Sequence, residues 1–241
     1  MSSPIPSPQN DTARLQRQFE EISILAGGLA HEIRNPLSTI SMNLELIAEE
    51  VEDEGTPASR RLLQRIATIQ QECGQLEAIL NDFLQYARVG QIDAEPADLN
   101  EIVTSFIDFY RTQANEHRVE ISPHLGSDLP NVEVDRSLLR QVLMNLGRNS
   151  LEAMPAGGVI ELQTRREDDR VLLEFIDNGE GMDEKTRDRI FEAFFSRKQG
   201  GSGLGLATVR KIVEAHRGQI HCESEPGQGT RMTILLPLRN L

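Results

Sequence analysis

The chain has 241 residues, of which 38% are hydrophobic and 4% aromatic, and its formal net charge at pH 7 is −13. This apolar content is enough for one or two folded domains, which excludes a globally disordered chain. The negative charge repels phosphate backbones and the chain has no Trp, so nucleic-acid binding is not expected. Two widely separated cysteines, Cys73 and Cys222, indicate reduced thiols rather than a disulfide framework.

The sequence contains no apolar run close to the roughly 20 residues that a membrane-spanning helix needs. Its first residues also lack the apolar core of a signal peptide. We therefore expect a cytoplasmic chain without membrane contact of its own. This expectation holds equally for the soluble part of a longer membrane protein.

The first part of the chain is predicted to be a helical hairpin. Residues 1–11 are rich in Pro and Ser and are expected to form a flexible lead. Within residues 12–89, two series of apolar residues recur at spacings of three and four, which predicts two long helices separated by an acidic turn. The first series is Ile22, Ala26, Leu29, Ile33, Ile40, Leu44, Ile47 and Val51, and the second is Leu62, Ile66, Ile69, Cys73, Leu76, Leu80, Phe83 and Ala87.

A single hairpin of this kind is too thin to bury both apolar series. Two hairpins from two copies of the chain bury them when they pair as a four-helix bundle. The pattern therefore predicts a homodimer.

A second domain is predicted over residues 99–241, after a linker over residues 90–98 that contains Gly90 and Pro96. Helices are expected over residues 100–117, 136–153, 185–191 and 204–216, and strands over residues 119–125, 132–134, 159–165, 170–176, 219–224 and 230–236. Helices that alternate with strands in this way pack on a mixed sheet as an α/β sandwich. The expected fold class is α+β, a dimeric helical hairpin followed by an α/β sandwich.

The first predicted helix carries the string HEIRNPL over residues 31–37. His31 lies off the apolar series, and Asn35 follows one turn later on the same face. A neutral imidazole is a nucleophile, and the adjacent Glu32 carboxylate can accept its proton. Pro36 is expected to kink the helix.

A lone histidine beside a proline would favour no particular function, but the complete string resembles the H-box of sensor histidine kinases. The resemblance implies that His31 is the phosphoacceptor and Glu32 the base. It further implies that Asn35 holds a water molecule for dephosphorylation of a partner.

Asn145 and Asn149 lie four residues apart on the helix predicted over residues 136–153. Amide oxygens can bind Mg²⁺, which usually shares its ligands with phosphate groups. The surrounding string QVLMNLGRNSLEAM resembles the N-box of the same kinases, which implies that both asparagines contact ATP and Mg²⁺. Gly147, Arg148 and Ser150 depart from the usual pattern, and Ser150 stands where Ala is common.

Two glycine-containing segments extend the likeness. The string DNGEGM over residues 177–182 resembles the first glycine box, which implies that Asp177 accepts a hydrogen bond from the adenine amino group. The string GGSGLGL over residues 200–206 opens a predicted helix, whose N–H groups suit an anion, and resembles the second glycine box. The resemblance also places Lys198 at the start of the ATP lid of these kinases. The remaining nucleotide-binding residues that it implies are Gly179, Gly181, Lys198, Gly201, Gly203, Leu204, Gly205 and Thr230.

These motifs cover about residues 22–237, and the start of the lid favours a nitrogen-regulation-like subgroup. The resemblance implies a phosphoacceptor hairpin followed by a Bergerat-type ATP-binding domain, with ATP and Mg²⁺ as cofactors. It also implies phosphoryl transfer from His31 to an aspartate of a response regulator, and phosphatase activity on that regulator.

Two alternatives stay open. An ATP-hydrolysing Bergerat machine, like gyrase, Hsp90 or MutL, carries a Glu four residues before the Mg²⁺-binding Asn, where this chain has Asn145. A pseudokinase would use bound nucleotide only to support a scaffold, although all the nucleotide motifs of this chain are intact. Transfer of label from γ-labelled ATP to the chain distinguishes the histidine kinase from both alternatives.

Overall fold

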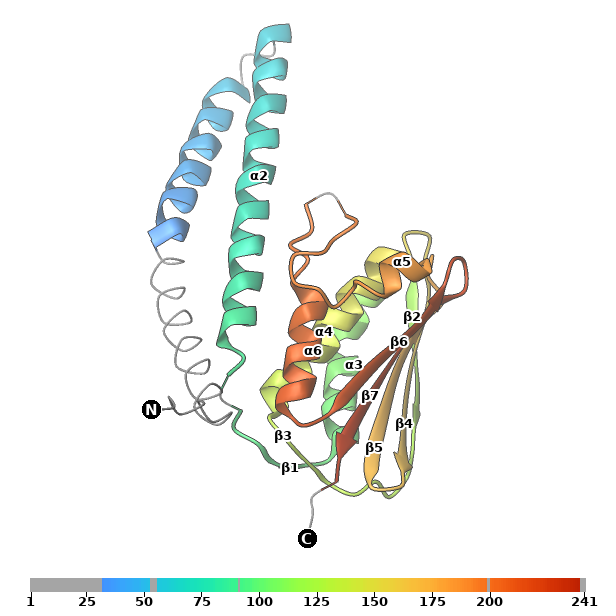
Figure 1. The fold of residues 1–241 in the computed structure, drawn as a ribbon. Helices are drawn as coiled ribbons and strands as arrows, with labels where there is room; N and C mark the ends of the chain where they lie inside the picture. Colours follow the sequence, from blue (N-terminus) through green and yellow to red (C-terminus); the bar gives the residue numbers. More distant parts are fainter. Residues whose placement is uncertain (1–31, 53–55, 91, 199, 239–241) are drawn as a thin grey trace, which may run out of the picture. The chain divides into compact units, whose positions relative to one another are not determined.

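The computed structural model describes residues 32–52, 56–90, 92–198 and 200–238. They form two compact units, each of which is described by itself (Figure 1). The hairpin unit contains the described residues up to 90 together with residues 197–202. The sandwich unit contains residues 92–196 and 203–238. His31 lies just outside the described residues.

The hairpin unit contains a helix over residues 32–52 and α2 over Pro57–Arg88, which confirms the second predicted helix and the described part of the first. The start of the first predicted helix, residues 22–31, lies outside the described residues. The first helix continues through Pro36, where the sequence predicts a kink. Thr56 caps α2, because its Oγ1 accepts a hydrogen bond from the Ser59 amide at 3.0 Å. Pro57 occupies the first turn, where its missing N–H has no cost.

Much of the apolar surface of the hairpin stays exposed in a single copy. Ile66, Cys73 and Ala87 of the second series are buried. The large apolar side chains of this unit that are more than a third exposed are Ile33, Ile40, Met42, Leu46, Ile47, Leu62, Ile69 and Leu76. One copy therefore does not bury both series, as the sequence predicts.

The sandwich unit contains a five-stranded sheet with the order β2-β4-β5-β7-β6. Strands β2 and β4 are parallel and the other neighbours are antiparallel. Figure 1 shows the helices of this unit on one face of the sheet. The strands are β2 (Val119–Leu125), β4 (Gly158–Glu167), β5 (Arg170–Asp177), β6 (Gln219–Glu225) and β7 (Gly229–Pro237), and the long helices are α3 (Leu99–Glu116), α4 (Arg136–Ala153) and α6 (Gly205–Ala215).

The predicted elements of this domain are all present, with two differences. Strand β1 (Glu95–Ala97) lies within the segment predicted to be a linker and pairs antiparallel with β3 (Val132–Val134). Helix α5 (Glu184–Arg187) is a single turn and is shorter than predicted. The chain after it continues in hydrogen-bonded turns, such as the 2.9 Å bond from the Glu192 amide to the Arg189 carbonyl.

Gly147 departs from the family pattern for a packing reason. A Cβ atom at this position would lie 2.9 Å from Tyr110 Cε1 and 3.2 Å from Phe106 Cζ. The two α3 rings are stacked, with centroids 5.0 Å apart. Glycine inside a helix costs about 1 kcal/mol relative to alanine. Here it lets the Tyr110 ring pack directly on the α4 backbone.

We expect Tyr110→Phe to leave the free energy of unfolding unchanged at neutral pH, or to raise it by up to about 1 kcal/mol. The Tyr110 hydroxyl is buried without a hydrogen-bond partner among the described residues, so its removal costs no hydrogen bond. Urea unfolding of the two proteins measures the difference. A loss of stability in the variant at neutral pH would show that the hydroxyl has a partner.

The same pair of proteins has a predicted pH dependence. Burial raises the pKa of Tyr110 from 10.0 to about 12. Between these values the unfolded chain has lost the phenol proton and the folded chain has kept it, so stability falls as pH rises through this window. The wild type should therefore lose more stability than Tyr110→Phe on alkalinisation above pH 10.

Candidate functional site

The candidate site lies where α4, the loop after β5 and the start of α6 come together. Asn145 is 7% exposed, and its Nδ2 donates to the Gly205 carbonyl at 3.4 Å. The helix with the two asparagines and the second glycine segment are therefore in direct contact. The sequence predicted both of these residues as nucleotide-binding groups.

Asp177 ends β5 with a buried carboxylate that accepts three hydrogen bonds. Its Oδ1 accepts from the Gly179 amide at 3.0 Å and from the Thr230 amide at 3.2 Å. Its Oδ2 accepts from the Ser150 hydroxyl at 2.7 Å. Thr230 lies opposite Asp177 in the β5–β7 register. The structure thus brings together three predicted residues, Asp177, Gly179 and Thr230.

Ser150 is a site residue that the sequence did not assign. It is 3% exposed and comes directly after Asn149 on α4. The available signal was its departure from the alanine common in the family, because a hydroxyl at a buried position needs a partner. That partner, Asp177, is 27 residues away in the chain.

The loop after Asp177 is fixed by backbone hydrogen bonds on both sides. The Glu180 amide donates to the Ala153 carbonyl at 3.1 Å, at the end of α4. The Glu180 carbonyl accepts from the Gly227 amide at 2.7 Å, in the turn between β6 and β7. Gly181 follows with a φ of +64°, in the left-handed region that favours glycine.

We expect Gly181→Ala to lower the free energy of unfolding by about 3 kcal/mol or more and to weaken nucleotide binding. The new Cβ would overlap the Glu225 carbonyl oxygen, in addition to the strain of the positive φ. Gly227→Ala is the matched control, because its φ is +76° but nothing lies within 4 Å of its added Cβ. It should cost about 1 kcal/mol. Equal losses in denaturant unfolding would mean that the contact with Glu225 does not matter.

Asn149 lies one turn after Asn145 and is partly buried. Its Nδ2 is buried without a hydrogen-bond partner among the described residues. Because the oxygen and nitrogen of an amide are assigned from their surroundings, the Asn149 oxygen could equally occupy the place of Nδ2. An orphaned amide on the site side of α4 fits a polar group supplied by a ligand. No cluster of His, Cys, Asp or Glu in the described residues could hold a metal ion by itself.

The second glycine segment opens α6. Leu204 is the N-cap of α6, and its apolar side chain makes no cap hydrogen bond to the first-turn amides. Gly203 has a φ of +66°, and its carbonyl accepts from the Phe194 amide at 3.0 Å. Lys198 and Gly201 belong to residues 197–202 of the hairpin unit, so their roles stay predictions.

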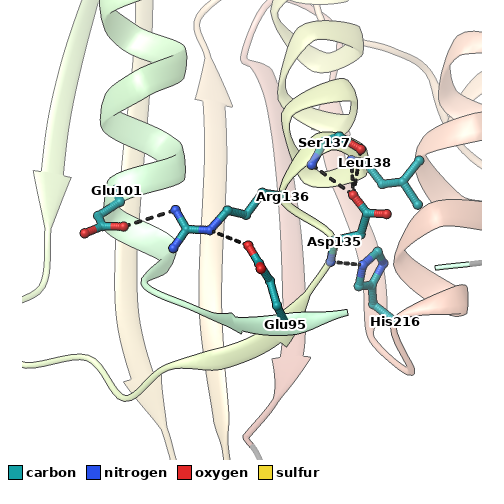
Figure 2. A network of polar contacts seen from close by, with 7 residues as sticks. All are labelled: Glu95, Glu101, Asp135, Arg136, Ser137, Leu138 and His216. Atoms are coloured by element: carbon teal, nitrogen blue, oxygen red, sulfur yellow. Dashed lines mark hydrogen bonds and ion pairs between the residues drawn. The ribbon is translucent and has the colours of Figure 1, made fainter. Parts of the chain in front are cut away.

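The opposite ends of α4 and α6 are held by the polar network drawn in Figure 2. The Asp135 amide, at the start of α4, donates to His216 Nε2 at the end of α6 over 2.9 Å. Arg136 forms ion pairs with Glu95 at 3.0 Å and Glu101 at 3.1 Å. The Asp135–His216 bond joins the two helices away from the site, and the Asn145–Gly205 contact joins them at the site. The Arg136 ion pairs join the start of α4 to β1 and α3.

The predicted phosphoacceptor region is described only from Glu32 onward. Glu32 and Asn35 are exposed on the helix over residues 32–52. Between them, Arg34 donates to Asn81 Oδ1 of α2 at 2.7 Å. This contact holds the two helices of the hairpin together beside the HEIRNPL string.

Comparison with known protein families gives two matches that together cover most of the chain. Residues 21–92 match the His Kinase A (phospho-acceptor) domain. Residues 134–240 match the histidine kinase-, DNA gyrase B-, and HSP90-like ATPase family. The chain belongs to the histidine kinase family. It has the domain content of the transmitter core of a two-component histidine kinase.

Curated relatives of this histidine kinase core include longer sensor proteins. The alginate biosynthesis sensor protein KinB of Pseudomonas aeruginosa is 35% identical over 92% of this chain and 38% of its own length. The sensor histidine kinase ZraS of Klebsiella oxytoca is 35% identical over 95% of this chain and 49% of its own length. The chain thus spans less than half of these relatives, and the nitrogen-regulation-like subgroup stays a prediction.

Solved structures of histidine kinases share the fold. Full-length ShkA in complex with AMPPNP is 29% identical, with a TM-score of 0.68 over 88% of this chain and 45% of that chain. ThkA in complex with the response regulator protein TrrA is 24% identical, with a TM-score of 0.67 over 98% of this chain and 68% of that chain. None of the helices in the described part of our histidine kinase core has the length and apolar character of a membrane span.

Proposed function

We propose that this chain is an ATP-dependent protein-histidine kinase that phosphorylates its own His31. The observation that carries the nucleotide half of the proposal is the buried Asp177 carboxylate, held by Ser150, Gly179 and Thr230. A carboxylate fixed in this way is a ready acceptor for the amino group of adenine. The string HEIRNPL carries the acceptor half.

The remaining side chains suit the phosphate end of the nucleotide. Asn149, with its orphaned amide, and Asn145 would hold Mg²⁺ through their oxygens. When bound, this ion would neutralise charge on the phosphate oxygens. The first-turn amides of α6 from Gly205 onward suit the triphosphate. The family resemblance of the sequence implies that Lys198 would add a positive charge.

The chemical step needs little beyond positioning. A ring nitrogen of neutral His31 attacks the γ-phosphorus in line, the bond to the β–γ bridging oxygen breaks, and ADP leaves. The Glu32 carboxylate accepts the ring proton. The exposure of Glu32 on the first helix supports this role, because a base at this position must be open to the incoming nucleotide.

The proposed partners are a second copy of the chain, supported by the hairpin, and a response regulator, supported by the family. The exposed apolar side chains of one hairpin, among them Ile40, Ile69 and Leu76, support a homodimer in which two hairpins form a four-helix bundle. The phosphoryl group on His31 then passes to an aspartate of a response-regulator receiver domain. The HEIRNPL string and the phosphoacceptor-domain match support that partner.

Incubation of the purified chain with γ-labelled ATP tests the proposed function. A kinase gives labelled protein whose label is lost in acid and kept in base, as expected for phosphohistidine. An ATP-hydrolysing machine gives labelled inorganic phosphate without labelled protein. A nucleotide-binding scaffold gives neither product, and either of the last two results would overturn the proposal.

The proposed phosphatase activity predicts that Asn35→Ala keeps autophosphorylation and loses most dephosphorylation of the regulator. The spacing of four residues predicts that Asn35 shares a helix face with His31, so a receiver docked at His31 would also lie over Asn35. Its amide can orient the water that hydrolyses an aspartyl phosphate, whereas transfer from ATP needs only a nucleophile and a base. The measurement is the decay of phosphorylated receiver with kinase and ADP after ATP is removed.

Asn43→Ala is the matched control for this experiment. Asn43 lies two turns further along the same exposed helix, and its side chain bonds only locally, to the Thr39 carbonyl at 2.8 Å. It should leave both activities unchanged. If Asn35 only accommodates the helix at Pro36, its replacement should change both activities together or neither.

A further inference from the structure

Ser150 gives this site a feature that its common alanine counterpart lacks. The Ser150 hydroxyl is buried and donates to Asp177 Oδ2 at 2.7 Å. The other oxygen, Oδ1, already accepts from Gly179 and Thr230. A carboxylate has about four lone-pair positions, so one acceptor position is left, on Oδ2.

We propose that Ser150 is a positioning residue that sets the preference of this site for adenine over guanine by locking the Asp177 carboxylate. The proposal rests on the proposed function, in which Asp177 reads the base. It assigns to Ser150 no contact with the reacting atoms.

The lock follows from how the carboxylate is held. The Gly179 and Thr230 amides both bind Oδ1, so without Ser150 the carboxylate can rotate about the bond that joins it to Cβ. That torsion is broad in aspartate. The Ser150 hydroxyl binds Oδ2 and fixes the plane of the group. Because both residues are buried, a hydrogen bond to the charged oxygen is strong there.

A fixed carboxylate distinguishes the two purines. Adenine presents an amino group, which can donate to the remaining position on Oδ2, whereas guanine presents a carbonyl oxygen at the equivalent position. That oxygen meets a carboxylate oxygen that Ser150 prevents from turning away. Without the hydroxyl, the carboxylate can rotate or take up a water molecule. The adenine bond then weakens and the penalty on guanine falls.

Equilibrium titration of ATP and of GTP into the full chain tests this inference. Ser150→Ala should bind ATP about 5- to 10-fold more weakly and should lose about 10-fold in the ratio of ATP to GTP affinity. Ser150→Cys keeps most of the side-chain volume but has a weak donor, so its ratio should also fall. Ser150→Thr keeps the hydroxyl and should retain most of the ratio.

The matched control is Ser137→Ala, at the other end of α4. The Ser137 hydroxyl donates to the Asp135 carboxylate at 2.6 Å, so this variant also loses a serine–aspartate hydrogen bond, at an exposed position far from the candidate site. Its nucleotide ratio should stay at the wild-type value. A ratio that falls equally in Ser137→Ala would mean that selectivity follows general stability, and would overturn the inference.

A double-mutant cycle tests whether Ser150 acts through Asp177. In an Asp177→Asn background, Ser150→Ala should no longer lower the ratio, because the group at the Oδ2 position is then an NH₂, which cannot accept from adenine. A fully additive effect there, or a wild-type ratio in folded Ser150→Ala or Ser150→Cys, would overturn the role of Ser150 alone. A wild-type chain without any preference for ATP would overturn both this inference and the proposed base recognition by Asp177.

Discussion

A chain that carries His31→Gln is expected to bind ATP as the wild type does and to take up no acid-labile phosphoryl group. Glutamine keeps a polar side chain of similar length, but its amide nitrogen is not a nucleophile at phosphorus. The side chains that we assign to adenine and Mg²⁺ lie on α4, β5 and β7, so ATP affinity should not change. Calorimetric titration tests the unchanged ATP binding, and label transfer measured on the same preparation tests the loss of phosphorylation.

His124→Gln is the control for this change. His124 is an exposed residue of β2, whose ring lies 3.3 Å from the Ser122 hydroxyl. This variant should be labelled to the wild-type level. Full labelling of His31→Gln would show that another residue is the phosphoacceptor, and loss of ATP binding in it would show that the first helix helps to hold the nucleotide.

The sequence predicted the helices and most strands well because their signals are local. The alternating apolar residues of β4, the continuous apolar run of β5 and the three-four spacing in α4 are each visible within one element. Strand β1 was missed because Glu95–Ala97 is only three residues long and includes Pro96. Its strand conformation depends on pairing with β3, which comes 35 residues later and leaves no local pattern.

The same distinction explains what the sequence could say about the site. The family motifs identify Asp177 and Thr230, and the β5–β7 register places these residues opposite each other. The partner of Ser150 and the reason for Gly147 depend on contacts between separate elements. Gly147 and Ser150 were therefore visible in the sequence as departures from a motif, but their physical reason became clear only from the fold.

Asp177→Asn is expected to lower ATP affinity by about 10- to 100-fold and to reduce or reverse the preference over GTP. The Gly179 and Thr230 amides both need an acceptor, so the single oxygen of asparagine should take the place of Oδ1. Its NH₂ group then replaces Oδ2. The Ser150 hydroxyl can rotate and accept from this NH₂, which lets the protein keep its fold.

The consequence for the nucleotide follows from the NH₂ group at the Oδ2 position. An adenine amino group would meet a donor there instead of an acceptor, so ATP loses its hydrogen bond and gains a repulsive contact. Guanine presents an acceptor at the same place, so GTP loses less affinity or gains some. Titration of both nucleotides, with thermal unfolding to confirm the fold, measures the effect. The Gly179 and Thr230 amides both need the oxygen of the new asparagine, so its NH₂ group has no other orientation. Wild-type ATP affinity in folded Asp177→Asn would therefore mean that another part of the chain reads the base.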